Sequence, residues 1–201
     1  MSAAQATDLK EISSPDDKRA RLLAAALELF ETRGFDGVAV PEIAAKAGVA
    51  TGTIYRYFTT KEALVNALYR YWKAVYNAIV LAPLPQGLET RDQFTTYWQR
   101  MMQFAQNHPR ATRFMDLHHH APYLDAGSIA AGGTYREVAE AFIGRARDSG
   151  AIRDIDPILV VALMWGAAVG LTKFAGQGAL TCDAATAIAM EEALWRAIAN
   201  D

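Results

Sequence analysis

A cluster of hydroxyl and cationic side chains between Lys46 and Lys61 is the part of the chain with the clearest chemistry. Its central seven residues carry two threonines, two tyrosines and one arginine. Hydroxyl and guanidinium groups donate hydrogen bonds to phosphate oxygens and to the edges of bases. The residue types therefore predict a DNA-binding surface made of Lys46, Thr51, Thr53, Tyr55, Arg56, Tyr57 and Lys61.

Three successive histidines, His118 to His120, suggest metal binding as a second kind of chemistry. Neighbouring residues on a helix point about 100° apart, so three in a row do not converge on one ion. Asp116 and His120 are the only pair of metal-binding residue types near this run that stand one helical turn apart in the sequence. We therefore expect no metal and no cofactor. One histidine is expected to face a pocket, one to lie at the C-terminus of its helix, and one to meet solvent.

Catalytic motifs are missing from the sequence. It contains no Gly-x-Ser-x-Gly motif and no glycine loop for phosphates, and its single cysteine, Cys182, has no histidine with an orienting group. We therefore expect that the protein is not an enzyme. A pair of carboxylates in a pocket would make an enzyme a candidate again.

The sequence also bears on compartment. One cysteine cannot form an intrachain disulfide, as is typical of a reducing cytoplasm. The first 17 residues are too polar for a secretory signal. The longest apolar run, Ile158 to Leu171, is shorter than the roughly 20 residues that span a bilayer. We expect it to form a buried helix, and we expect a cytoplasmic protein with no membrane partner.

The DNA-binding segment must be positioned by short helices. Pro41 suits the first turn of a helix, where its missing N–H would lack a partner. Gly48 suits the left-handed conformation that ends one helix and turns the chain into the next. Thr51 to Tyr57 is barely two turns long, so packing by Val49, Ile54 and Phe58 must hold it. This pattern predicts a helix-turn-helix.

Six clusters in this region stand at the spacings of one family: Gly34-Phe35-Asp36, Glu42-Ile43-Ala44, Ala47-Gly48-Val49, Gly52-Thr53-Ile54-Tyr55, Tyr57-Phe58 and Lys61-Glu62-Ala63-Leu64. On these residues the chain resembles the tetracycline-repressor (TetR) family of one-component bacterial regulators. The match covers about residues 15–68. The remainder resembles the family only in length, helicity and the position of its last two helices.

Three residues depart from the family pattern. Val38 and Ala39 stand where many relatives have threonine or serine, and Ala50 replaces a common serine. Loss of a cap costs about 0.5 to 2 kcal/mol of helix stability. The alanines either reduce stability slightly, with Pro41 and Thr51 compensating, or weaken and shift the contacts to phosphates.

Helix punctuation divides the whole chain. Ser14-Pro15-Asp16-Asp17 resembles a capping box and predicts a helix to Gly34, and Thr59 with Glu62 predicts a long helix that Pro83 ends. Further helices are expected over about 90–107, 109–120, 125 or 128 to 149, 157–176 and 183–199. The prediction is an all-α fold of about nine helices. It comprises a flexible arm (1–14), a helix-turn-helix domain (15–60) and a helical effector-binding and dimerisation domain (61–201).

The charges are distributed unevenly along the chain. The 201 residues carry a formal net charge of −2, so the protein as a whole is not a polyanion-binding particle. Between Lys18 and Lys61, seven basic residues stand against four acidic ones. The mildly basic end is therefore the one expected to meet phosphates.

The last two expected helices carry more apolar surface than one small domain needs. Glycines in the first of them would let a partner helix approach closely. In the family that the chain resembles, these helices form a four-helix bundle with a twofold mate. The interface residues expected from this are Ile158, Ala162, Gly166, Val169, Met190, Leu194 and Ile198. The alternative is that the pair completes the core of one chain.

Large, soft side chains between these regions are suited to line a cavity for a small, largely apolar or aromatic molecule. The expected pocket residues are Trp72, Tyr76, Trp98, Met101, Met102, Phe114, His118 and Trp165. Each of them is equally explained as helical core, and the pocket itself is implied by the resemblance.

The resemblance implies a homodimeric regulator that binds a palindromic double-stranded DNA operator. The leading hypothesis is a repressor released by a small-molecule effector. The alternative is the same architecture acting as an activator or without an effector.

Overall fold

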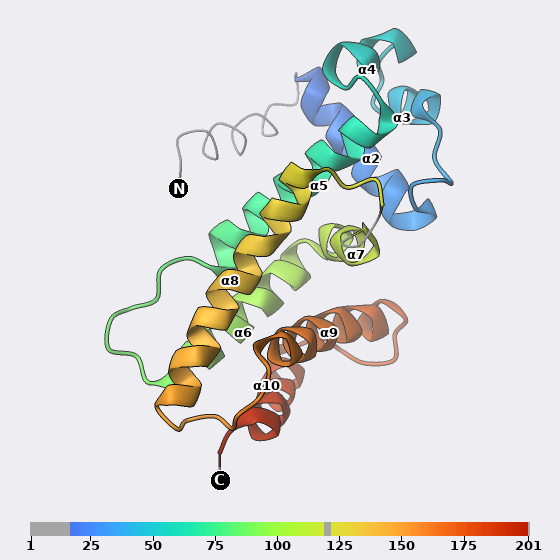
Figure 1. Cartoon of the computed structure of the whole chain (residues 1–201). Helices are drawn as coiled ribbons and strands as arrows, with labels where there is room; N and C mark the ends of the chain where they lie inside the picture. The colour runs from blue at the N-terminus through green and yellow to red at the C-terminus, as the bar shows by residue number, and fades with distance from the viewer. Residues whose placement is uncertain (1–16, 119–121, 201) are drawn as a thin grey trace. The chain divides into compact units, whose positions relative to one another are not determined.

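The structure is a computed structural model that describes residues 17–118 and 122–200. These residues form nine α-helices and one isolated antiparallel bridge between Ile152 and Ala199, which confirms the all-α prediction (Figure 1). The helices are α2 (Lys18–Arg33), α3 (Val40–Lys46), α4 (Thr51–Tyr57), α5 (Lys61–Val80), α6 (Thr90–Asn107), α7 (Pro109–His118), α8 (Ala126–Asp148), α9 (Pro157–Gly176) and α10 (Ala184–Ile198).

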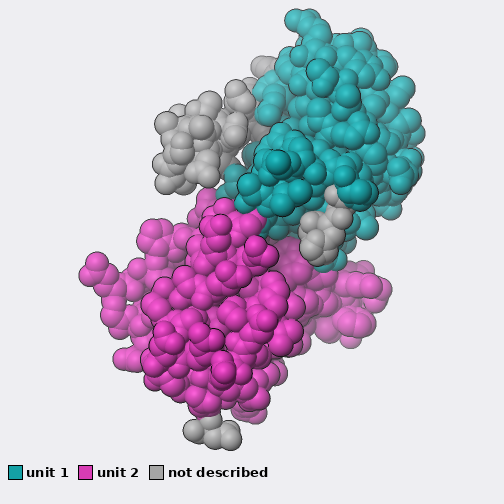
Figure 2. Space-filling model, viewed as in Figure 1, with its two compact units in different colours: residues 1–75, 110–132 teal, residues 76–109, 133–201 magenta. Residues whose placement is uncertain are grey.

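The chain divides into two compact units (Figure 2). Unit 1 contains the described residues up to Val75 and Arg110–Gly132, and unit 2 contains Tyr76–Pro109 and Gly133 onward. The compact units divide the chain within α5 and again within α8, and the domain boundary near residue 60 stays a prediction. Ion pairs of Arg110 and Arg113 on α7 with Glu28 and Glu31 on α2 join most of α7 to unit 1.

The N-cap of helix α2 lies three residues after the expected one. The side chain of Asp17 accepts a hydrogen bond of 2.8 Å from the backbone N–H of Arg19, which makes Asp17 the N-cap. Ser14, the predicted cap, lies outside the described residues. The helix ends at Gly34, whose φ of 68° is the left-handed region that glycine tolerates. Its buried face includes Leu22, Leu23 and Phe30.

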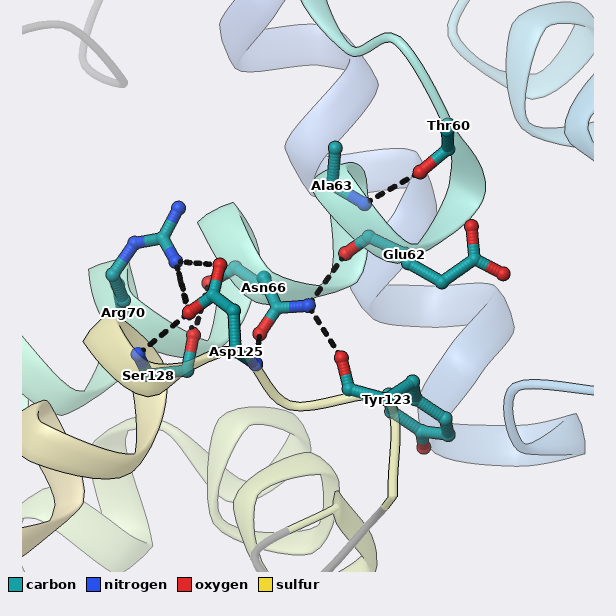
Figure 3. A network of polar contacts seen from close by, with 8 residues as sticks. All are labelled: Thr60, Glu62, Ala63, Asn66, Arg70, Tyr123, Asp125 and Ser128. Carbon is teal, nitrogen blue, oxygen red and sulfur yellow. Dashed lines mark hydrogen bonds and ion pairs between the residues drawn. The ribbon is translucent and has the colours of Figure 1, made fainter.

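Helix α5 is capped by Thr60, whereas the sequence pattern predicts Thr59 as the cap. The Thr60 hydroxyl oxygen accepts a hydrogen bond of 3.1 Å from the N–H of Ala63 (Figure 3). At the other end of α5, the guanidinium of Arg100 donates to the carbonyl oxygens of Val80, Ala82 and Pro83. These carbonyls have no partner within a helix, so the arginine satisfies the end that the proline interrupts.

In unit 2, α6 packs against both α9 and α10. The indole N–H of Trp98 donates to the carbonyl oxygen of Ala187 at 2.8 Å. Arg91 pairs with the buried carboxylate of Glu191 at 2.6 Å, and its guanidinium lies 5.1 Å from the centre of the Trp195 ring. A buried charge is tolerated when it is paired in this way, so the contact ties α6 to α10.

Helix α9 is more exposed than the predicted buried helix. Its 20 residues have a mean hydropathy of 1.9 over the most apolar window, of which 28% is buried. By length and composition α9 is therefore long and apolar enough to cross a membrane. The core helices of soluble proteins meet the same criterion, so one such helix does not indicate a membrane span. Leu159 and Leu163, one turn apart, are 53% and 41% exposed. This helix thus has one apolar face uncovered within a single chain.

Candidate nucleic-acid interface

The turn between α3 and α4 is set by Gly48, whose φ is +66°. The N–H of Gly48 donates to the carbonyl oxygen of Ala45 at 3.1 Å, and the N–H of Val49 donates to that of Ala44 at 3.0 Å. This pair of bonds is a Schellman motif, which ends α3 and satisfies its last carbonyls. The turn fixes the direction in which α4 leaves.

Helix α4 presents one face to the interior of unit 1 and the other to solvent. Ile54 and Phe58, the residue that follows the helix, are buried, whereas Val49, the third residue of the packing prediction, is half-buried. Tyr55 is 52% exposed, Tyr57 is 43% exposed, and Arg56 is also exposed. A seven-residue helix is not stable by itself, so this buried contact is what holds the polar face in place. That face combines hydroxyl donors with one guanidinium, as binding to phosphates and base edges requires.

Both short helices lack a side-chain cap. Ala39 caps α3 and Ala50 caps α4, and neither makes a side-chain hydrogen bond. The proposed compensation by Thr51 is wrong, because Thr51 is the first residue of α4 and lies inside the cap. In α3 the carboxylate of Glu42 accepts a bond of 3.4 Å from the N–H of Ala39. Glu42 also pairs with Arg33, which lowers the pKa of its carboxyl group.

Lys61 makes contacts that the sequence did not predict. Its ammonium donates hydrogen bonds to the carbonyl oxygens of Phe35 at 2.8 Å and Val38 at 3.0 Å. It also lies 4.1 Å from the centre of the Phe35 ring, which is a cation–π distance. Lys61 therefore fastens the loop between α2 and α3 to the start of α5. An ammonium has three donors, so one is left for a DNA phosphate, and that contact stays a prediction.

Lys46 is also engaged within unit 1. Its ammonium lies 2.7 Å from a carboxylate oxygen of Glu28, and both side chains are more than a third exposed. This hydrogen bond is the main reason that the pKa of Glu28 is lowered. Exposed ion pairs contribute little to stability, so the pair can open to release Lys46 for another anion.

A polar network joins α5 to the segment before α8 (Figure 3). The buried amide of Asn66 donates to the carbonyl oxygens of Glu62 and Tyr123, both at 2.8 Å, and accepts from the N–H of Asp125 at 2.8 Å. Arg70 pairs with Asp125 at 2.7 Å, which lowers the pKa of that carboxyl group. Sequence reasoning missed this network, because Tyr123 and Asp125 lie more than fifty residues from Asn66.

The predicted pocket residues divide between the units. Trp72, Phe114 and His118 belong to unit 1. His118 is fully buried, which lowers its pKa, and its ring centroid lies 4.5 Å from that of Phe114. Its Nδ1 atom pairs with the hydroxyl of Tyr123. This histidine is thus packed inside unit 1. His119 and His120 lie outside the described residues.

The other five predicted pocket residues, Tyr76, Trp98, Met101, Met102 and Trp165, belong to unit 2. Tyr76 is buried among rings, with centroids 5.1 Å from Phe104 and 5.7 Å from Trp165. An apolar hollow of about 20 Å³ lies elsewhere in this unit, and none of the eight predicted residues lines it. Its walls are Leu81, Tyr97, Tyr135, Val138, Ala139, Phe142, Ile143, Val160, Val161 and Met164. A space of this size holds about one water molecule.

The predicted interface residues do not share one surface. Ile158, Ala162 and Gly166 are exposed on α9, and Val169 and Met190 are half-buried. Leu194 and Ile198, in contrast, are 7% and 2% exposed and lie in the core of unit 2. Side chains already buried in one chain add no area to an interface, so these two assignments are corrected. The apolar residues exposed on α10 include Ile188 instead.

Two family profiles match the chain. The profile of bacterial regulatory proteins of the tetR family matches residues 22–68. The profile of the tetracyclin repressor-like C-terminal domain matches residues 59–200. Together they span the helix-turn-helix and nearly all of the remaining chain.

Individual relatives agree with the profiles. The HTH-type transcriptional regulator RutR of Escherichia coli (strain K12) is 29% identical over 168 residues, which cover 80% of this chain and 76% of RutR. The HTH-type transcriptional repressor NemR of the same strain is 34% identical over 93 residues, covering 45% and 47% of the two chains. The crystal structure of a TetR family transcription regulator from Marinobacter aquaeolei VT8 superposes with a TM-score of 0.81 at 21% identity, over 92% of this chain and 96% of that one. This last likeness shows the fold.

Proposed function

The chain belongs to the tetR family of bacterial regulatory proteins, and on that premise we propose that this DNA-binding transcriptional regulator is a homodimeric repressor that a small molecule releases from a palindromic operator. The family membership makes it a transcription regulator and not an enzyme. Repression, dimerisation and the effector are the proposed part.

The observation that carries the proposal is the exposed face of α4. Tyr55, Arg56 and Tyr57 point away from the core while Ile54 and Phe58 anchor the helix from behind. One helix of seven residues contacts too little DNA for specific binding, which usually buries roughly 1,000 Å² or more of protein surface. Two copies of this face, spaced for successive major grooves, supply the missing contacts.

A homodimer accounts for the uncovered face of unit 2. Leu159, Leu163 and Phe174 are exposed on α9, and Ile188 is exposed on α10. Large apolar patches of this kind mark surfaces that a partner covers. Gly166 has nothing within 4 Å of the position its Cβ would take, so a helix of a second chain can approach it closely. We place the interface on α9 and α10, with Leu194 and Ile198 supporting it from inside.

The effector is proposed to enter unit 2. The apolar hollow near Tyr97 and Tyr135 has aromatic and aliphatic walls, which suit an apolar or aromatic molecule. Because the hollow holds only about one water molecule, binding must displace side chains such as Met164. A ligand that requires such a change favours the changed conformation, and this preference is the condition for coupling to DNA release.

Binding of the purified protein to the intergenic DNA upstream of its own gene, measured by mobility shift at several salt concentrations, tests the proposal. A specific shift that weakens with salt supports the operator-binding dimer. A reporter gene fused to the same DNA then distinguishes a repressor from an activator in the cytoplasm. Removal of the protein raises expression of the reporter only if the protein is a repressor. Absence of sequence-specific binding to any genomic fragment would refute the proposal.

A further inference from the structure

A groove on unit 1 is lined by no residue of α4, and Lys46 is its one lining residue among the predicted DNA contacts. It has a volume of about 410 Å³ and is lined by Arg21, Ala24, Ala25, Glu28, Lys46, Ala47 and Arg110. The residues come from α2, from the end of α3 and from the first turn of α7. Three of them are alanines, whose short side chains leave the space open between longer charged ones.

The charges in this groove do not balance. Among the described residues that line it, Arg21, Lys46 and Arg110 are cations and Glu28 is the one carboxylate. Glu28 lies 2.7 Å from Lys46 and 3.5 Å from Arg110, so it is shared between two cations. The other carboxylate near Arg110 is that of Glu31, at 3.7 Å, and it already pairs with Arg113 at 2.8 Å. The groove itself therefore has an excess of two positive charges.

Arg21 is the least satisfied of these cations. Its Nε atom is buried and has no hydrogen-bond partner among the residues that the structure describes. A buried donor without a partner costs free energy, which a bound acceptor recovers. Its Nη1 atom would lie 3.6 Å from a Cβ atom on Gly48. The guanidinium thus sits beside the turn that leads into α4.

We propose that this groove is a binding site for a phosphate group, held by Arg21 and Arg110 with Lys46 as a third cation. Guanidinium groups match the geometry of phosphate oxygens with pairs of parallel hydrogen bonds, and the excess positive charge attracts a phosphate anion. Glu28 is the competitor that the phosphate displaces from Lys46. The group belongs either to the DNA backbone or to a free phosphorylated molecule.

The site is tested by titrating the full-length protein with inorganic phosphate at constant ionic strength, balanced with chloride, and following the arginine Nε–Hε signals by NMR. We expect saturable shifts of the Arg21 and Arg110 signals, and the Arg110 signal reports binding in the Arg21→Gln variant. Arg21→Gln is expected to weaken phosphate binding about tenfold, the loss of a charge-assisted hydrogen bond. Glu28→Gln is expected to strengthen binding severalfold, because it removes the competing carboxylate. Opposite changes in affinity cannot come from a general loss of folding.

Arg33→Gln is the matched control, because it removes the same charge from the other end of α2 without touching the groove. No saturable shift, or equal weakening by Arg33→Gln and Arg21→Gln, would overturn the site. A second titration with a DNA duplex present separates the two sources. The site belongs to the DNA backbone if the duplex abolishes the phosphate-induced shift of the arginine signals. In that case the salt dependence of DNA binding should also have a slope about one unit smaller for Arg21→Gln. Phosphate binding that persists beside the duplex assigns it to a free phosphorylated molecule.

Discussion

The ammonium of Lys61 lies over the Phe35 ring and donates hydrogen bonds to the carbonyl oxygens of Phe35 and Val38. A lysine expected to hold DNA thus also holds the loop that leads into α3. Lys61→Ala should lower the free energy of unfolding by about 1 to 3 kcal/mol, because two carbonyls lose a charged donor. Urea unfolding measures the change, with the exposed Lys18→Ala as control. An unchanged stability of Lys61→Ala would mean that the lysine serves DNA alone.

The exposed residues of α4 are expected to differ in what they recognise. Tyr57→Phe should weaken binding on every DNA sequence to a similar degree, because a phosphate contact carries no sequence information. Arg56→Ala should change the preferred base at one position of each half-site, at a cost of about 1 to 3 kcal/mol. Binding to a set of single-base operator variants checks both. A uniform loss for Arg56→Ala would contradict a base-reading role.

The Asn66 network predicts a large effect from a small change. Asn66→Ala removes three hydrogen bonds and leaves the partly buried N–H of Asp125 without its acceptor. The expected loss is about 2 to 3 kcal/mol of unfolding free energy. Asn107→Ala, at the exposed end of α6, is the control and should change stability by less than about 0.5 kcal/mol. Similar losses of unfolding free energy in the two variants would show that the hydrogen bonds of Asn66 do not stabilise the fold.

Two leucines of unit 2 should separate assembly from folding. Leu163→Glu places a charge on the exposed face of α9 and should weaken the dimer at least about tenfold while the chain stays folded. Leu194→Ala should instead lower the melting temperature, because it leaves a cavity in the core. Sedimentation and thermal unfolding report the two effects. Leu117→Glu, on an exposed leucine of α7, is the control for assembly. A wild-type monomer at micromolar concentration would contradict the proposed interface.

His118 predicts a pH dependence of stability. Burial lowers the pKa of His118 below its usual 6.5, so the unfolded chain binds a proton at a higher pH than the folded chain. The stability contributed by the neutral ring is present above about pH 6.5 and is lost as the pH falls toward the lowered value. His118→Gln should therefore flatten the fall in unfolding free energy between pH 7.5 and about pH 5. The same slope in both proteins would exclude His118 as the cause.

The helix-turn-helix was predictable because its signals are local. The Gly48 turn, the buried Ile54 and the exposed Arg56 all follow from spacing and residue type within about twenty residues. The caps of α2 and α5 were missed, because Ser14 and Thr59 each have a neighbouring residue of similar chemistry, Asp17 and Thr60. Local patterns do not choose between such neighbours.

Contacts over long separations were not predictable in the same way. The packing of His118 against Phe30 and the network around Asn66 join segments that only the folded chain brings together. The same holds for the interface. The sequence of α10 predicts an apolar stripe, but it does not show which residues of that stripe the core of unit 2 buries. Leu194 and Ile198 were therefore assigned to the surface although they lie inside.

Selection of genomic fragments by the purified protein, followed by sedimentation of the purified complex, tests the central claim most directly. The account predicts one enriched palindrome whose half-sites are spaced by about a helical turn or a multiple of it, with two chains bound per site. It also predicts that Arg56→Ala enriches an altered sequence. Enrichment of no sequence at moderate salt, or one chain bound to a site without symmetry, would contradict the account.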